Sequence, residues 1–187
     1  MSRRRVAITG LGLVSPFGDS LADFFQRILS GESAVRLLRL DELPRALAIP
    51  FVACPGFQAS AVLGKALAGT MDRFAQLGTA AAFAAWDDAG LDRRQNAESR
   101  ERWGVSWGTA LGGTLAYEKG YKELWQKGRE RISPLSVILG MNNAANAHIS
   151  IQLGLGGVSM SHTVACASSS IAIGEAFRRV RSGEAPI

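Results

Sequence analysis

Short apolar segments alternate with longer helix-like segments along this chain, and this alternation restricts the folds that are open to it. The apolar segments are residues 5–9, 103–107 and 157–164. The helix-like segments are residues 21–30, 73–89 and 166–182. Strands that alternate with helices are typical of an α/β fold with a parallel sheet. The sequence therefore predicts an α/β chain with a mixed, mostly parallel sheet flanked by helices.

Residues with capping chemistry stand at the ends of these helix-like segments. Ser20 with Asp23 three positions later resembles a capping box, and Gly31 suits the end of the same helix. Asp72 can cap the alanine-rich helix that follows it. These residues predict two helices with defined ends.

Prolines mark the parts of the chain that break this regular alternation. Pro44, Pro50 and Pro55 interrupt the stretch 32–65, so we expect that stretch to be irregular. Pro134 follows Ser133 and is expected at the first position of another helix.

Composition predicts a packed domain, residues 1–187, with a solvated basic surface. The chain is 47% hydrophobic and 20% charged, which is too apolar for a disordered segment. Its net charge is +5, but the basic groups, which include Arg3, Arg94 and Arg178, are scattered and lack interleaved aromatic residues. We therefore expect no nucleic-acid partner.

The chain shows neither a membrane span nor a disulfide framework. It has no run of eighteen apolar residues, and its two cysteines, Cys54 and Cys166, are too few for a disulfide framework. Gly10, Gly12 and Pro16 break the apolar start, which argues against a signal peptide. We expect a cytoplasmic protein with reduced thiols.

Two glycine-rich motifs resemble known sites but lack their context. Gly10-Leu-Gly12 follows an apolar segment, yet the third glycine and the acidic residue of a dinucleotide fingerprint are missing. Gly104-Val-Ser106-Trp-Gly108 matches a hydrolase nucleophile elbow, but glycines follow where a helix should begin. We expect neither site, and we interpret the second motif as a strand end where backbone approaches a ligand.

Cys166 is the strongest candidate nucleophile. It stands between a predicted strand and a predicted helix, flanked by the small residues Ala165, Ala167 and Ser168. A helix N-terminus favours a thiolate, because its unpaired N–H groups and macrodipole attract negative charge. The alternative is a buried structural cysteine, and spacing alone does not separate the two.

Five landmarks in order resemble the β-ketoacyl-[acyl-carrier-protein] synthases, condensing enzymes of thiolase-like fold. The landmarks are Arg4–Gly18, Met71-Asp72 with the helix to Leu91, Gly108–Gly113, Asn143–Ser150 and Ala165–Ala176. The resemblance implies the N-terminal half of that fold, with the second half absent from residues 1–187.

The resemblance also implies an activity and site residues. Cys166 would accept an acyl chain from an acyl carrier protein or acyl-CoA, and its amide would be one oxyanion-hole donor. Ala110 and Leu111 would line the acyl pocket. The enzyme would be an acyltransferase of fatty acid or polyketide synthesis that decarboxylates a malonyl thioester and joins it to the acyl group. No cofactor and no metal are implied.

The family places two catalytic histidines, a buried lysine and the second oxyanion amide in its other half. His148 and His162 are expected to pack or to lie at an interface rather than to replace them. The chain alone is therefore not expected to be competent, and a homodimer or a complementing C-terminal half is the expected partner. The alternative is a non-catalytic subunit that binds an acyl chain or stabilises a condensing enzyme.

Overall fold

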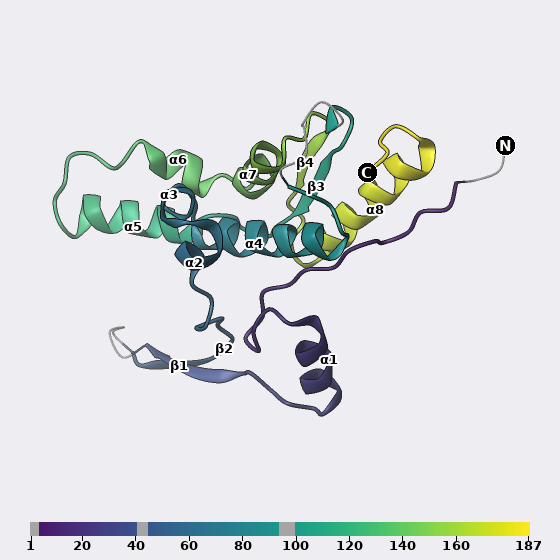
Figure 1. The fold of residues 1–187 in the computed structure, drawn as a ribbon. Coiled ribbons are helices and arrows are strands. Elements are labelled where there is room, and N and C mark those ends of the chain that lie inside the picture. Colours follow the sequence, from purple (N-terminus) through teal and green to yellow (C-terminus); the bar gives the residue numbers. More distant parts are fainter. Residues whose placement is uncertain (1–3, 41–44, 94–99) are drawn as a thin grey trace.

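The fold is built around a two-stranded parallel sheet with helices on both faces (Figure 1). The computed structural model describes residues 4–40, 45–93 and 100–187. Strands β3 (Val105–Gly108) and β4 (Ser159–His162) form the sheet. Helices α4 (Arg73–Asp88) and α7 (Ala144–Leu153) cover one face, and α8 (Ser168–Ser182) covers the other. The predicted α/β class is confirmed.

Alternation along β3 sorts its side chains between the two faces of the sheet. Val105 and Trp107 join the apolar cluster on the α4 and α7 side. Gly108 faces α8 instead, where an added Cβ would lie 2.5 Å from the backbone carbonyl carbon of Ser168. The glycine therefore lets α8 begin directly against the strand.

Small side chains bring α4 and α7 close together. Ala75 and Ala145 are fully buried in one cluster, and Phe83 packs with Trp86 and Ile149 in the next. Alanine adds little bulk between the helix axes, so the two helices can approach closely. This core holds strands β3 and β4 in position, and their ends extend beyond it.

The predicted first strand, residues 5–9, is not a strand in the structure. This segment is extended and largely exposed, with Ile8 at 77% exposure, and it runs past α8 towards the C-terminal end of α4 (Figure 1). A strand forms only by pairing, and this segment has no ladder in the described part of the chain. The parallel sheet is accordingly smaller than predicted.

Gly10 and Gly12 serve helix packing rather than a dinucleotide. A Cβ at either position would collide with a backbone carbonyl oxygen of α4, at Ala85 or Ala81. The amide of Leu11 also donates to Asp88 Oδ2 at 2.9 Å. The backbone of α4 therefore occupies the space that these two glycines leave open.

The stretch 32–65 is more regular than predicted. It contains the antiparallel hairpin of β1 (Arg36–Leu40) and β2 (Leu47–Phe51), followed by α2 (Ala59–Leu63). Pro50 lies in β2 opposite Leu37, which an outer strand tolerates because no ladder partner needs its amide. A short helix, α3 (Lys65–Ala68), completes the stretch. Pro44, Arg3 and Arg94 lie outside the described residues.

The predicted caps of the first helix are confirmed. Helix α1 (Leu21–Leu29) begins after Ser20, whose Oγ accepts a hydrogen bond from the Asp23 amide at 3.2 Å. Gly31, just past its end, has a φ of 74°, in the left-handed region that glycine favours.

Asp72 stands at the N-cap of α4 as predicted, but its side chain caps a different helix. Its Oδ2 accepts from the amide of Ala116 at 2.6 Å, in the first turn of α5 (Thr114–Trp125). Gly113 precedes α5 and has no side chain with which to cap it. The buried carboxylate therefore joins the starts of two helices.

The remaining helix begins one residue later than predicted. Helix α6 spans Leu135–Gly140, so Pro134 is its N-cap rather than its first residue. Among the described residues, no helix has both the length and the apolar character to cross a membrane.

Candidate functional site

Cys166 lies in the tight turn between β4 and α8. The turn is a single 3₁₀ segment, Ala165–Ala167, and α8 itself begins at Ser168, two residues later than predicted. Ala165 has a φ of 51°, which costs a residue with a side chain about 1–2 kcal/mol. The turn presents the free Cys166 thiol to solvent beside the start of a 15-residue helix. Cys166 is therefore not buried, as the structural alternative supposes, and its role as nucleophile stays a prediction.

Ser168 holds this turn together, and the sequence analysis gave it no role beyond small size. It is only 2% exposed, and its Oγ accepts from the Val164 amide at 2.8 Å. The same oxygen lies 2.7 Å from the Ala165 carbonyl oxygen and 3.2 Å from that of Thr109. A serine at the start of an apolar helix was the available signal, because such residues bond to nearby backbone.

The glycine loop 108–113 lies against this turn. The amide of Thr109, the residue after β3, donates to the His162 carbonyl oxygen at 3.1 Å. Asn142 crosses from the neighbouring segment and donates to Thr163 Oγ1 at 3.1 Å. An added Cβ at Gly112 would collide with the Asn142 side chain, so Asn142 fixes both the loop and the end of β4. The sequence analysis missed Asn142.

The predicted acyl-pocket residues lie on this loop but are not enclosed. Ala110 and Leu111 are both exposed, and Leu111 retains 73% of its accessible surface. The contact between Ser168 Oγ and the Thr109 carbonyl oxygen brings their loop next to the Cys166 turn. Their role as pocket walls stays a prediction.

Both histidines hydrogen-bond within the fold, in keeping with a packing role. His162 Nε2 lies 3.2 Å from Ser106 Oγ, across the two strands. His148 Nε2 lies 3.2 Å from the Thr70 carbonyl oxygen, which links α7 to the segment before α4. Ser106 sits inside β3 rather than at a strand-to-helix turn, so it lacks the geometry of a nucleophile elbow. The described residues bring together no group of three metal-ligating side chains.

The glycines around Ser106 do allow a close approach to the strand, as interpreted from the sequence. The group that approaches is backbone of this chain rather than a ligand. A Cβ at Gly104 would lie 2.5 Å from the Val158 carbonyl oxygen. Gly108 similarly admits the start of α8. Both glycines thus allow backbone of this chain, rather than a ligand, to approach β3.

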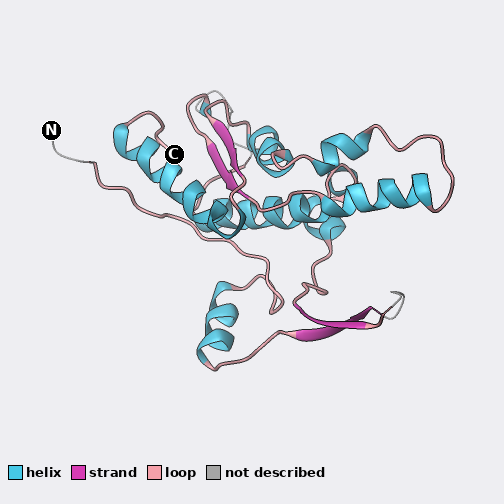
Figure 2. Cartoon of the chain, turned by 180° about the vertical axis from the view of Figure 1, so that it is seen from behind, coloured by secondary structure: helices cyan, strands magenta, loops and turns pink. Residues whose placement is uncertain are grey.

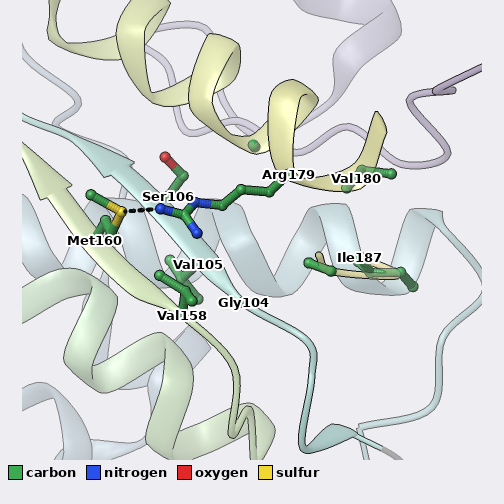
Figure 3. A pocket seen from close by; sticks show the side chains of 10 residues that line it. Gly104, Val105, Ser106, Val158, Met160, Arg179, Val180 and Ile187 are labelled. Carbon is green, nitrogen blue, oxygen red and sulfur yellow. Dashed lines mark hydrogen bonds between the residues drawn. The ribbon is translucent and has the colours of Figure 1, made fainter. Parts of the chain in front are cut away.

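A small, partly open cavity lies away from Cys166, between the strands and the last turns of α8 (Figure 3). Its volume is about 40 Å³, enough for one or two water molecules but not for an acyl chain. The Arg179 side chain crosses it, with Nη2 3.1 Å from Met160 Sδ. Ile187 borders it from the end of the chain. This cavity is a packing gap and not the substrate site.

Comparison with known proteins agrees with this geometry. The sequence matches the family described as beta-ketoacyl synthase, N-terminal domain, over residues 3–187. It is 34% identical over 183 residues to 3-oxoacyl-[acyl-carrier-protein] synthase 2 of Staphylococcus aureus (strain COL), covering 97% of this chain and 44% of that protein. The chain thus spans less than half the length of this curated relative.

Solved structures share the fold. The ishigamide ketosynthase/chain length factor superposes with a TM-score of 0.80 at 26% identity, over 98% of this chain and 46% of that one. A type II polyketide acyl-carrier protein in complex with its ketosynthase gives 0.79 at 20% identity, over 98% and 48%. The strand, turn and helix around Cys166 are therefore part of a thiolase-like fold, and this chain belongs to the β-ketoacyl synthase family, of which it forms the N-terminal domain.

Proposed function

We propose that this chain supplies the nucleophile of a β-ketoacyl-[acyl-carrier-protein] synthase, and that the nucleophile is Cys166. The observation that carries the proposal is the exposed Cys166 thiol on a tight turn at the start of α8, in a chain of this family. The start of a helix stabilises negative charge that develops nearby during acyl transfer. A turn of this kind leaves the sulfur open to a thioester.

The reaction proceeds in two steps. The Cys166 thiolate attacks the carbonyl carbon of an acyl thioester, forms a new thioester and releases the carrier thiolate, which takes up a proton. A malonyl thioester then loses carbon dioxide, and the resulting carbanion attacks the Cys166 thioester. A carbon–carbon bond forms as the carbon–sulfur bond breaks, which regenerates the thiolate.

Residues 1–187 are expected to support the first step better than the second. The second step needs donors that hold the enolate, and the two histidines of the described chain are engaged with Ser106 and Thr70. Losing one oxyanion donor typically slows a reaction ~10²–10³-fold. We therefore expect slow acylation of Cys166 and no detectable condensation by this chain alone.

The acyl donor is proposed to be an acyl carrier protein or acyl-CoA, with Ala110 and Leu111 contacting the acyl chain. One solved neighbour is described as a ketosynthase in complex with an acyl-carrier protein, and the proposed partner is of that class. Both acyl-pocket residues are exposed here, so further walls must complete the pocket.

We also propose that the chain assembles, either as a homodimer or with a complementing C-terminal half. Exposed apolar residues of α8 support this, because Ile173 is 66% exposed and Phe177 is 41% exposed. Exposed apolar faces of this kind mark interfaces. Light scattering that finds a stable monomer of this chain at micromolar concentration would contradict the homodimer and leave the complementing half as the proposed partner. A cytoplasmic location stays part of the proposal.

Intact-mass spectrometry after incubation with acyl-CoA tests the nucleophile directly. We expect at most one acyl group per chain, mapped to Cys166, and its loss in Cys166→Ala. Cys54→Ala is the matched control and should acylate like the unmodified chain. Acylation that survives Cys166→Ala would overturn the assignment. Release of carbon dioxide from a malonyl thioester by residues 1–187 would show that a group in this chain replaces the missing histidines.

A non-catalytic partner subunit is the second candidate, and the exposed apolar residues of α8, Ile173 and Phe177, favour it equally. Such a subunit would bind an acyl chain or stabilise a synthase without forming the Cys166 thioester. Absence of any acylation, from a chain whose Cys166 is freely alkylated, would support this alternative.

A further inference from the structure

Ser168 closes a hydrogen-bonded ring around Cys166. Its Oγ accepts from the Val164 amide at 2.8 Å and lies 2.7 Å from the Ala165 carbonyl oxygen. A hydroxyl has one proton to donate and can accept as well, so both bonds form together. The ring ties residues on the N-terminal side of Cys166 to the first residue of the helix on its other side.

This ring acts on the strained part of the turn. Ala165, next to Cys166, holds a φ of 51°, a conformation that a residue with a side chain avoids unless its surroundings impose it. The hydrogen bonds of Ser168 Oγ with Ala165 and Val164 impose this conformation on Ala165. Burial of Ser168, at 2% exposure, keeps water from competing for them.

Ser168 also reaches the glycine loop. Its Oγ lies 3.2 Å from the Thr109 carbonyl oxygen, and the missing Cβ of Gly108 lets the start of α8 come this close. Ala110 and Leu111 follow immediately in the chain. The hydroxyl has one proton, so its bond to Ala165 and the longer contact with Thr109 share that proton in a three-centre arrangement. This shared contact links the turn that carries the thiol to the loop that carries the two acyl-pocket candidates.

We propose that Ser168 is a positioning residue for Cys166, whose hydroxyl sets the direction of the thiol and its register with the loop 109–111. The inference rests on the proposed function, since it gives that function a second residue. Ser168 does not touch the acyl group. It acts by holding Ala165 in its strained conformation, so that Cys166 projects from the turn at the helix start.

The test compares alkylation of Cys166 and Cys54 by iodoacetamide in the same 187-residue molecule, across a series of pH values. Peptide mass spectrometry gives the ratio of the two rates. We expect Ser168→Ala to lower the ratio about tenfold, the equivalent of one lost hydrogen bond, and to alter its pH profile. Ser168→Thr keeps the hydroxyl and should restore the ratio to within about twofold.

Ser136→Ala is the matched control, because Ser136 is a serine of α6 that is also buried, at 7% exposure. It should leave the rate ratio and its pH profile unchanged, whatever its effect on the melting temperature. A folded Ser168→Ala variant with an unchanged ratio overturns the inference, and the hydroxyl is then only structural. If Ser168→Ala does not fold, Ser168→Thr decides, since a tenfold lower ratio in that folded variant contradicts the proposal.

Alkylation does not require acyl transfer, so failure of this inference is distinguishable from failure of the proposed function. A chain whose Cys166 is never acylated, but whose alkylation depends on Ser168, retains the positioning role and loses the enzyme assignment. A chain that is acylated equally with and without the Ser168 hydroxyl retains the nucleophile and loses the positioning role.

Discussion

The molecule has two regions that both contain regular helices and strands, but only one of them has a buried core. We call α4, α7, α8, β3 and β4 the nucleus, and residues 19–58, with α1, β1 and β2, the arm. Helix α1 and the β1–β2 hairpin lie apart from the nucleus (Figure 2), and none of the arm's described residues is buried. The last residues of the arm contact the start of α4, where Arg73 donates to the carbonyl oxygens of Cys54 and Phe57. The nucleus instead holds fully buried alanines and Thr79. The difference teaches that regular elements in this chain do not require burial within it.

The arm is well formed locally and incomplete in its packing. Helix α1 has its caps, and the hairpin has its register, yet Phe25 is 57% exposed and Leu37 is 66% exposed. Exposed apolar side chains such as these stabilise the protein only when another surface covers them. The nucleus should therefore carry most of the stability, and substitutions of one residue type in both regions test this.

The largest difference is expected for glycine substitutions. In Gly108→Ala, the new Cβ would lie 2.5 Å from the Ser168 backbone and displace α8 from the sheet, at a cost of about 3 kcal/mol. Gly56→Ala in the arm has nothing within 4 Å of its Cβ, and should change stability by less than about 0.5 kcal/mol. Urea denaturation of both variants measures this. Equal costs would contradict the division into nucleus and arm.

Two arginines give the next comparison. Arg100 is 3% exposed and donates to the Leu153 carbonyl oxygen at 2.6 Å. Its guanidinium carbon also lies 4.8 Å from the centre of the Trp86 ring. Arg100→Met should cost about 2–3 kcal/mol, because the buried carbonyl loses a charged donor. Arg27 in the arm pairs with Glu32 at the surface, so Arg27→Met should cost less than about 1 kcal/mol. Thermal melting of the two variants checks the order, and a larger loss for Arg27→Met would reverse the comparison.

Helix caps should show a smaller difference in the same direction. Asp72→Ala removes the acceptor of the Ala116 amide and should cost about 2 kcal/mol, since that bond is short and buried. Ser20→Ala removes an exposed cap of α1 and should cost about 0.5 kcal/mol. Helical circular dichroism during denaturation reports both. A negligible effect of Asp72→Ala would show that α5 does not depend on its cap from α4.

The smallest effect is expected from a surface charge on α5, outside both regions. The hydrogen bond from Lys127, at 2.5 Å, lowers the pKa of Glu123 below its ordinary value of 4.5, and Arg129 adds to the effect. A lowered pKa stabilises the fold above the ordinary value and loses that contribution as the pH falls through the folded value. Glu123→Gln should therefore be slightly less stable at neutral pH and equal in acid. Denaturation midpoints at the two pH values test it, and a difference that persists in acid would have another cause.

The sequence by itself determined the elements whose signals are local. Ser20 and Gly31 predicted the ends of α1, and the alanine-rich run after Asp72 predicted α4, because caps and periodicity act within a few residues. Small residues around Cys166 predicted a tight turn between strand and helix, although the helix begins two residues later. The order of the family landmarks was also readable, and the match over residues 3–187 confirms the family.

Only the tertiary structure decided which of these elements pair and which side chains they engage. Residues 5–9 have the composition of a strand, but a strand depends on a neighbour from elsewhere in the chain. Asp72 bonds to Ala116, and Ser168 to Thr109, over separations of 44 and 59 residues that no local pattern encodes. Hydrogen bonds of this kind form only after packing has brought distant backbone groups together, so their partners are a property of the fold.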